Sequence, residues 1–224
     1  MSSIATLLDE PRGLVARSTS FLWEKGAGMR RAFVAATVIA SLGLTGLPAQ
    51  AAVQVTIQDF MFTPSKLAVA EGTAITWHYD SGTTHHTSTQ NGPLKLWNTR
   101  SLLPGQTSSP IVLRSAGAYP YHCVVHPSMV GIIRVPIRVS PITGTTSTTF
   151  TIRLATAKQT GLAYDIQKRK GAGAWRAWKT GVTALVVRFT HRAGGGTWWF
   201  RSRVHRISNG ARSGWSPARR ITIS

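Results

Sequence analysis

The middle of the chain carries a stretch that gathers three potential metal ligands, Tyr121-His122-Cys123-Val124-Val125-His126-Pro127-Ser128-Met129. The thiol of Cys123, the imidazole of His126 and the thioether of Met129 follow one another at three-residue intervals. If Cys123 ends a strand, the loop after it can bring all three donors together. Pro127 stiffens that loop because its ring fixes φ. The β-branched residues of Val130–Val139 predict the return strand.

The donor types indicate which metal such a site would select. Two His and one Cys in a trigonal arrangement, with a long and weak axial Met, form blue-copper electron-transfer centres. Structural zinc sites use several Cys or paired Cys and His, and Cys123 is the only Cys of the chain. A lone Cys is often just a small buried residue. Its order with His126 and Met129, between two apolar strands, nevertheless favours copper.

A second imidazole has to come from another part of the chain. The stretch Ser81–Thr89 offers His85 and His86 next to each other. Successive side chains of a strand face opposite sides, so only one of the two can point inward. Both remain candidates on this argument.

Phe60–Val139 resembles the plastocyanin and azurin family of cupredoxins, most closely amicyanin-like forms with a short Cys-x-x-His-x-x-Met loop. Besides that loop, the resemblance rests on stretches in the family's order: Phe62-Thr63-Pro64-Ser65, Val69-Ala70-Glu71-Gly72-Thr73, Ile75-Thr76-Trp77, Leu103-Pro104-Gly105-Gln106 and Ala116-Gly117-Ala118-Tyr119-Pro120-Tyr121-His122-Cys123. It covers roughly the middle third of the chain. The resemblance implies a Greek-key β-sandwich.

The resemblance also implies one type 1 copper ion as the cofactor. Its ligands would be Cys123, His126, Met129 and one upstream His. The family often follows its first His ligand with Thr, as in His86-Thr87-Ser88, and this favours His86 over His85.

His122 has two interpretations because it directly precedes Cys123. In copper nitrite reductases a neighbouring His-Cys pair links an electron-transfer copper to a catalytic copper. Amicyanin-like proteins have Tyr-His-Cys without a second metal, and Val124 stands where multicopper oxidases continue with a bridging His. We expect His122 to be an outward-facing strand residue, as we do for His78 and His191, and the protein not to be an enzyme.

Residues 1–51 carry features of an N-terminal extension and signal peptide. Met29-Arg30-Arg31, the apolar run 32–47 and Ala49-Gln50-Ala51 match the charged region, apolar region and cleavage site, which predicts cleavage after Ala51. The run is short for a membrane span, which needs roughly 20 residues, although an uncleaved anchor is the alternative. We expect a secreted or extracytoplasmic protein, in the periplasm or at the cell wall, without a transmembrane span in its mature form.

Two further questions about export stay open. Met29 is the expected true start because the preceding residues include Asp9, Glu10 and Glu24, although an extended charged region is the alternative. Arg30-Arg31 also leaves the general secretory and twin-arginine routes open.

Beyond residue 140 the chain predicts a second all-β unit. Short apolar stretches separated by Gly-rich turns predict strands at Phe150–Leu154, Ala163–Lys168, Leu185–Thr190, Trp198–Ile207 and Arg219–Ile223. The unit resembles a fibronectin type III module, an immunoglobulin-like β-sandwich, in Tyr164-Asp165-Ile166-Gln167-Lys168-Arg169, Trp198-Trp199-Phe200-Arg201-Ser202-Arg203-Val204 and Asn209-Gly210-Ala211-Arg212-Ser213-Gly214-Trp215-Ser216-Pro217. The expected domains are therefore 52–140, a cupredoxin domain, and 141–224, a fibronectin type III-like domain.

Positive charge is concentrated in the second unit. Residues 52–140 contain six Lys or Arg against three acids, a net charge of +3, whereas 141–224 contain fifteen against one, a net charge of +14. Phosphate contacts together with Trp stacking would suit nucleic acid. An exported protein meets anionic envelope polymers more readily. We therefore expect an anionic cell-envelope polymer as a partner of this domain, and no specific nucleic acid.

The predicted function is that of an exported type 1 copper protein that carries single electrons between redox protein partners. One alternative is an extracytoplasmic protein that binds or delivers copper with the same donors. A second alternative is a wall-binding adhesion protein that uses a cupredoxin fold as a scaffold.

Overall fold

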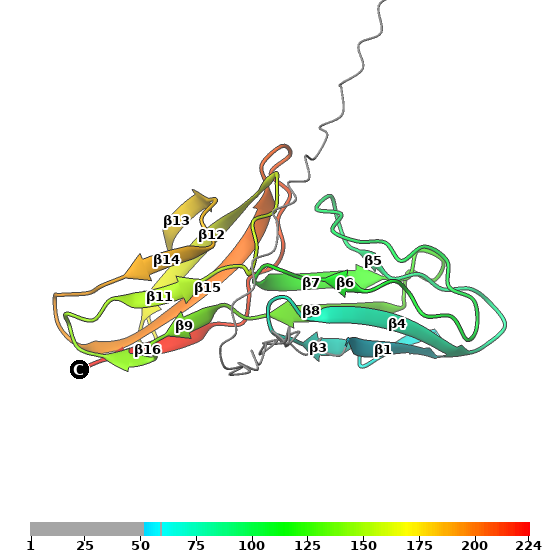
Figure 1. Ribbon diagram of the computed structural model, residues 1–224, viewed down its shortest axis with the longest axis horizontal. Coiled ribbons are helices and arrows are strands. Elements are labelled where there is room, and N and C mark those ends of the chain that lie inside the picture. The colour runs from blue at the N-terminus through cyan, green and yellow to red at the C-terminus, as the bar shows by residue number, and fades with distance from the viewer. Residues whose placement is uncertain (1–51, 59) are drawn as a thin grey trace, which may run out of the picture. The chain divides into compact units, whose positions relative to one another are not determined.

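A computed structural model describes residues 52–58 and 60–224, and the regular elements within this part of the chain are all β-strands (Figure 1). The predicted all-β fold class is therefore confirmed. Over the same residues, no helix has the length and apolar character needed to cross a membrane. The predicted signal peptide and its alternatives concern residues 1–51, which lie outside the described part of the chain.

The first half of the described chain forms two four-stranded sheets. One has the order β2-β1-β4-β6 and consists of β1 (Val53–Gln58), β2 (Met61–Thr63), β4 (Ala74–Ser81) and β6 (Ile111–Val112). The other has the order β3-β8-β7-β5 and consists of β3 (Lys66–Ala68), β5 (Thr89–Gln90), β7 (Gly117–His122) and β8 (Val130–Val135). β1 runs parallel to β4, and β7 and β8 form an antiparallel pair.

Alternation along β4 explains how these sheets share a core. Ile75, Trp77 and Tyr79 are buried, whereas the intervening Thr76 and His78 are only partly buried, as the period of a strand requires. The Trp77 ring meets the Tyr121 ring of β7 edge-on, with centroids 5.6 Å apart, so aromatic side chains connect the two sheets. This core fixes the end of β7, from which the loop with the candidate metal ligands starts.

The strand expected at Val130–Val139 is divided in the structure. β8 ends at Val135, directly before Pro136, because proline has no N–H to donate to a sheet. The chain resumes as β9 (Arg138–Ser140), which pairs with a strand of the second half.

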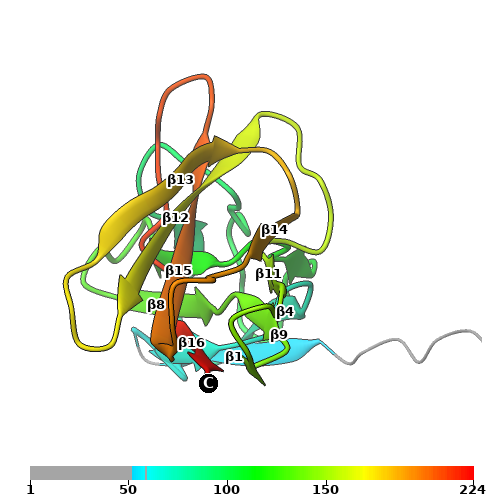
Figure 2. The same ribbon diagram turned by 90° about the vertical axis from the view of Figure 1, so that its left-hand side faces the viewer.

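The second half also forms two sheets. One is three-stranded, in the order β14-β11-β9, with β11 (Phe150–Arg153) and β14 (Val186–Phe189). The other is five-stranded, in the order β10-β16-β15-β12-β13, with β10 (Thr143–Gly144), β12 (Leu162–Lys170), β13 (Arg176–Val182), β15 (Gly196–Arg206) and β16 (Arg219–Ile223). Figure 2 shows the long strands β12 and β15 side by side. The rings of Phe189 and Phe200, one from each sheet, meet with centroids 4.9 Å apart.

All five strands predicted for the second half occur, with ends shifted by at most a few residues. β13 has no counterpart among them, because most of its side chains are exposed and do not alternate in polarity. The resemblance of this half to a fibronectin type III module remains a prediction, and so does the domain boundary after residue 140. β9 places Arg138–Ser140 in a sheet with β11.

Candidate metal centre

The loop between β7 and β8 holds three of the four predicted ligands. Cys123 directly follows the last residue of β7, and Met129 directly precedes β8. The Cys123 N–H donates to the Met129 carbonyl at 3.0 Å, and the Met129 N–H donates to the His126 carbonyl at 2.9 Å. These backbone bonds close the loop on itself, so the positions of Cys123 and His126 are fixed relative to each other.

His86 comes to this loop from the segment between β4 and β5. Its N–H donates to the Leu102 carbonyl at 3.1 Å, and its carbonyl accepts from the Leu102 N–H at 2.8 Å, which forms an isolated antiparallel bridge. His86 is 1% exposed, whereas the neighbouring His85 is exposed. The two side chains therefore face opposite ways, and the structure brings His86 rather than His85 to the loop.

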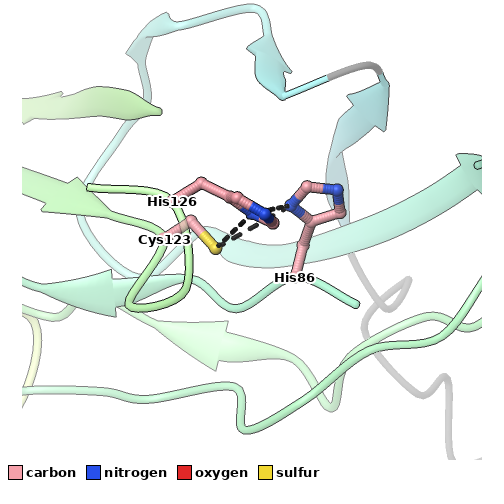
Figure 3. Close-up of side chains that lie close together, drawn as sticks. All are labelled: His86, Cys123 and His126. Atoms are coloured by element: carbon pink, nitrogen blue, oxygen red, sulfur yellow. Dashed lines mark hydrogen bonds between the residues drawn. The ribbon is translucent and has the colours of Figure 1, made fainter. Parts of the chain in front are cut away.

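The donor atoms of His86, Cys123 and His126 converge on one point (Figure 3). The Cys123 Sγ lies 3.8 Å from Nδ1 of His86 and 3.7 Å from Nδ1 of His126. The two Nδ1 atoms are 3.1 Å apart. Together they form a compact triangle of one sulfur and two nitrogens.

The size of this triangle can be compared with that of a metal site. Ligand bonds of about 2.0 Å to nitrogen and about 2.3 Å to sulfur, separated by ~120°, place two nitrogens roughly 3.5 Å apart and nitrogen and sulfur roughly 3.7 Å apart. The separations between sulfur and nitrogen match these values, and the nitrogens are slightly closer. The donor set therefore fits a trigonally bound ion, and the thiolate and imidazoles suit copper.

Met129 is the fourth predicted ligand, and it lies buried at the end of the same loop, 1% exposed. Cys123 is fully buried, whereas His126 is only partly buried. The site is thus enclosed on the sulfur side, and the His126 imidazole is its most solvent-accessible donor.

Thr87 holds the Cys123 sulfur from the opposite segment, and the sequence did not single it out. Its backbone N–H donates to Sγ at 3.3 Å, and its Oγ1 accepts from the Val124 N–H at 2.9 Å. Hydrogen bonds around a ligating Cys sulfur help to set the redox potential of a copper centre. The place of Thr87 directly after His86 is the signal that could have identified it.

Two aromatic rings frame the imidazoles. Tyr79 meets His86 edge-on with centroids 4.8 Å apart, and Phe60 meets His126 edge-on at 4.7 Å. Phe60 also lies 5.6 Å from the His86 ring while its own side chain is 56% exposed. The alternation along β4 could have predicted that Tyr79 points inward, whereas Phe60 has a positive φ of 66° and no periodic pattern indicates its role.

Burial lowers the pKa of His86 below its ordinary value, and the nearby His126 and His85 act in the same direction. All three causes disfavour the imidazolium form. A neutral imidazole retains the lone pair that a metal ligand needs.

Three further histidines, His78, His122 and His191, lie outside the donor triangle. The His122 ring contacts the Asn91 Oδ1 at 2.5 Å, and the His78 Nδ1 lies 2.8 Å from the Thr107 Oγ1. His191 stacks against Phe189 in the second half. His122 neighbours the site in sequence without joining its donors.

Comparison with known proteins supports the interpretation of this half. Residues 31–135 match the family model described as cupredoxin-like domain. No curated protein matches the chain significantly.

Solved structures of three different proteins are among those that match the chain. A mutant of amicyanin in its reduced Cu(I) form is 26% identical over 39% of this chain and 84% of its own, with a TM-score of 0.35. A purple cupredoxin from Nitrosopumilus maritimus is 26% identical over 37% of this chain and 98% of its own, with a TM-score of 0.34.

The third is the copper-containing nitrite reductase from Thermus scotoductus SA-01, which is 27% identical over 38% of this chain, with a TM-score of 0.35. This chain spans only 22% of the length of that reductase. The family match includes His86 and the whole loop from Cys123 to Met129. The part of the chain that brings these donors together thus lies within the stretch that matches the cupredoxin-like domain model.

Proposed function

We propose that this protein is an exported type 1 copper protein that carries single electrons between redox partner proteins. The observation that supports the proposal is the triangle of one thiol sulfur and two imidazole nitrogens, with separations of 3.1–3.8 Å. Bound copper would supply a one-electron couple between Cu(II) and Cu(I) at this position.

Each residue of the site would have a distinct role in binding copper. Cys123 would provide the thiolate, His86 and His126 the two imidazoles, and Met129 the weak axial sulfur. Thr87 would hold the thiolate through its N–H. The fixed backbone of the loop would keep the donors in place during the change of charge, so that little reorganisation accompanies electron transfer.

His126 offers the route by which electrons would enter and leave. Cys123 and Met129 are almost completely buried, while the His126 ring is partly exposed and lies against the exposed Phe60. A redox partner would therefore approach on the side of His126. These four donors would fill the positions around one ion, so the proposed function includes no substrate and no catalytic step.

Electrochemistry of the full chain loaded with copper tests the proposal. An electron carrier should show a reversible wave of one electron per protein molecule and should cycle repeatedly between its oxidised and reduced forms without loss of copper. A protein that delivers copper should instead bind Cu(I) selectively and release it to a chelator on oxidation. Cys123→Ser should abolish the reversible wave, and its persistence would contradict the assignment of this site.

A further inference from the structure

The outer face of the five-stranded sheet carries a two-dimensional array of arginine and tryptophan side chains. Residues directly opposite in neighbouring strands share a face of the sheet. The register places Arg169 of β12 opposite Trp199 of β15, which is itself opposite Arg220 of β16. In the next rows Gln167 lies opposite Arg201, and Asp165 lies opposite Arg203. The facing pair β12 and β15 is visible in Figure 2.

Two further tryptophans from outside these strands complete the array. Trp175 lies with its ring centroid 4.8 Å from the Arg169 guanidinium carbon and 4.3 Å from that of Arg201. Trp215 lies 5.0 Å from the Arg201 carbon and 4.4 Å from that of Arg203. Each distance is within the range of a cation–π contact. We call Arg169, Trp175, Trp199, Arg201, Arg203 and Trp215 the arginine ladder.

The five tryptophans of residues 141–224 fall into two groups. Trp178 and Trp198 pack against the core, whereas Trp175, Trp199 and Trp215 hold arginines on the outer face. The aromatic rings are thus supports that hold guanidinium groups in fixed positions.

Most of the charge on the arginine ladder is uncompensated. Asp165 is the only acidic residue of 141–224, and it pairs with Arg203 at 3.0 Å and with Arg212 at 3.5 Å. Arg201 donates from Nε and Nη2 to the neutral Gln167 side chain. Within the described residues, neither Arg169 nor Arg201 has an acidic partner, and the buried Nε of Arg169 has no hydrogen-bond partner.

We propose that the arginine ladder is a docking surface for a linear phosphodiester polymer of the cell envelope. Arg201 and Arg203 are two residues apart on one strand, so their Cα atoms are about 7 Å apart. This spacing suits successive anionic groups of an extended polymer. A guanidinium held against a ring can present its free N–H groups to phosphate oxygens as a planar fork. This docking function is independent of the metal centre.

The ring contacts argue against single-stranded nucleic acid as the ligand. Binding of that kind stacks bases on exposed aromatic faces. Trp175 and Trp215 each already contact two guanidinium groups, so their faces have little room for a base.

The distribution of apolar side chains argues against a lipid surface. Interfacial binding to a membrane inserts exposed apolar groups. Over the described residues, the large exposed hydrophobic side chains lie outside β12, β13 and β15. The arginine ladder therefore carries fixed positive charge but no large exposed apolar side chain that could insert into a membrane.

Binding of synthetic poly(glycerol phosphate) to the full chain tests the proposal. The double variant Arg169→Gln and Arg201→Gln should bind at least tenfold more weakly than the unaltered protein. The matched control is Arg188→Gln with Arg192→Gln, which removes the same charge from exposed positions on and after β14. The control should change affinity less than threefold. Equal losses in the two double variants would overturn the proposal, because binding would then follow net charge alone.

A second measurement needs no variant and avoids any effect on folding. The arginines of the unaltered full chain are modified with a dicarbonyl reagent, with and without the polymer, and the modified sites are identified by mass spectrometry. The polymer should slow modification of Arg169, Arg201 and Arg203 and leave Arg188 unchanged. Uniform protection, or protection centred elsewhere, would contradict the proposal.

The affinities of two other anionic ligands should also be compared with that of the polymer. A single-stranded DNA oligonucleotide with the same number of phosphates should bind no more tightly than the polymer. Vesicles containing phosphatidylglycerol should bind more weakly than the polymer at equal phosphate concentration. Tighter binding of either ligand would overturn the assignment to an envelope polymer.

Discussion

The backbone N–H of Thr87 donates a hydrogen bond to the Cys123 sulfur at 3.3 Å, across 36 positions of sequence. The Thr87 hydroxyl accepts from the N–H of Val124, the residue after the sulfur ligand. Thr87, directly after His86, thus holds both the Cys123 sulfur and the first peptide of the loop that follows it. These bonds connect the two segments that supply the candidate metal donors.

Thr87→Val tests the hydroxyl half of this connection. The substitution keeps the shape of the side chain and the backbone N–H but leaves the Val124 N–H without its acceptor. We expect the free energy of unfolding to fall by about 0.5–1.5 kcal/mol, measured by denaturant titration. The matched Thr87→Ser should retain most of the stability, because its hydroxyl can still accept the bond. Equal stability of the two variants would show that this hydrogen bond contributes little.

His86→Ala and His85→Ala separate the two neighbouring imidazoles. His86 lies within 3.8 Å of the Cys123 sulfur, whereas His85 is exposed. We expect His86→Ala to lose the intense visible band of thiolate-bound Cu(II), and His85→Ala to retain it. Both are measured by titration with Cu(II) under the same conditions. Loss of the band in the His85 variant alone would reverse the assignment.

Phe60→Ala should open the site to solvent. The Phe60 ring covers both imidazoles edge-on while remaining half exposed. We expect copper-loaded Phe60→Ala to bind an added small anion such as azide, seen as a changed EPR spectrum, at concentrations that leave the unaltered protein unchanged. Met61→Ala is the matched control, because Met61 is its equally exposed neighbour. Identical azide responses in the two variants would exclude a shielding role for Phe60.

The lowered pKa of Asp165 predicts a contribution to the free energy of unfolding that is lost in acid. Burial alone would raise its pKa, but the Arg203 side chain, the Gly181 N–H and the His205 charge together hold the pKa below its ordinary value. A carboxyl group with a lowered folded pKa binds fewer protons when folded, so its stabilisation is present above its unfolded pKa, near 3.8, and is lost as the pH falls through the folded pKa.

Asp165→Asn should therefore lower the free energy of unfolding by about 1.5–3 kcal/mol at neutral pH. Its difference from the unaltered protein should shrink as the pH falls below the unfolded pKa. Thermal melting at several pH values checks this, and Asp80→Asn is the control, because Asp80 is exposed and bonded to Gln58. A stability difference that does not change with pH would contradict the electrostatic origin.

The candidate ligands of the loop could be predicted from the sequence because they lie on one short segment. Cys123, His126 and Met129 needed only local spacing and the preference of soft ligands for copper. The choice of His86 depended on which of two neighbouring side chains a distant loop would bury. In the structure, the bridge between His86 and Leu102 accompanies the burial of the His86 side chain.

The features that the sequence missed depend on contacts between distant segments. Phe60 reaches the imidazoles from a loop with positive φ, and no periodicity marks such a residue. The arginine ladder requires the cross-strand register of β12 and β15, together with loops that return Trp175 and Trp215 to that face. Composition indicated the charge of this half but could not indicate where its cations would be fixed.

Visible and EPR spectroscopy of the full chain with one equivalent of Cu(II) tests the central claim most directly. If His86, Cys123 and His126 bind copper in a trigonal arrangement, the protein should show an intense thiolate-to-copper band and the small copper hyperfine splitting of a type 1 centre. Both signals should vanish in Cys123→Ser. A weakly coloured protein with the large hyperfine splitting of a tetragonal copper site, unchanged by Cys123→Ser, would contradict the account.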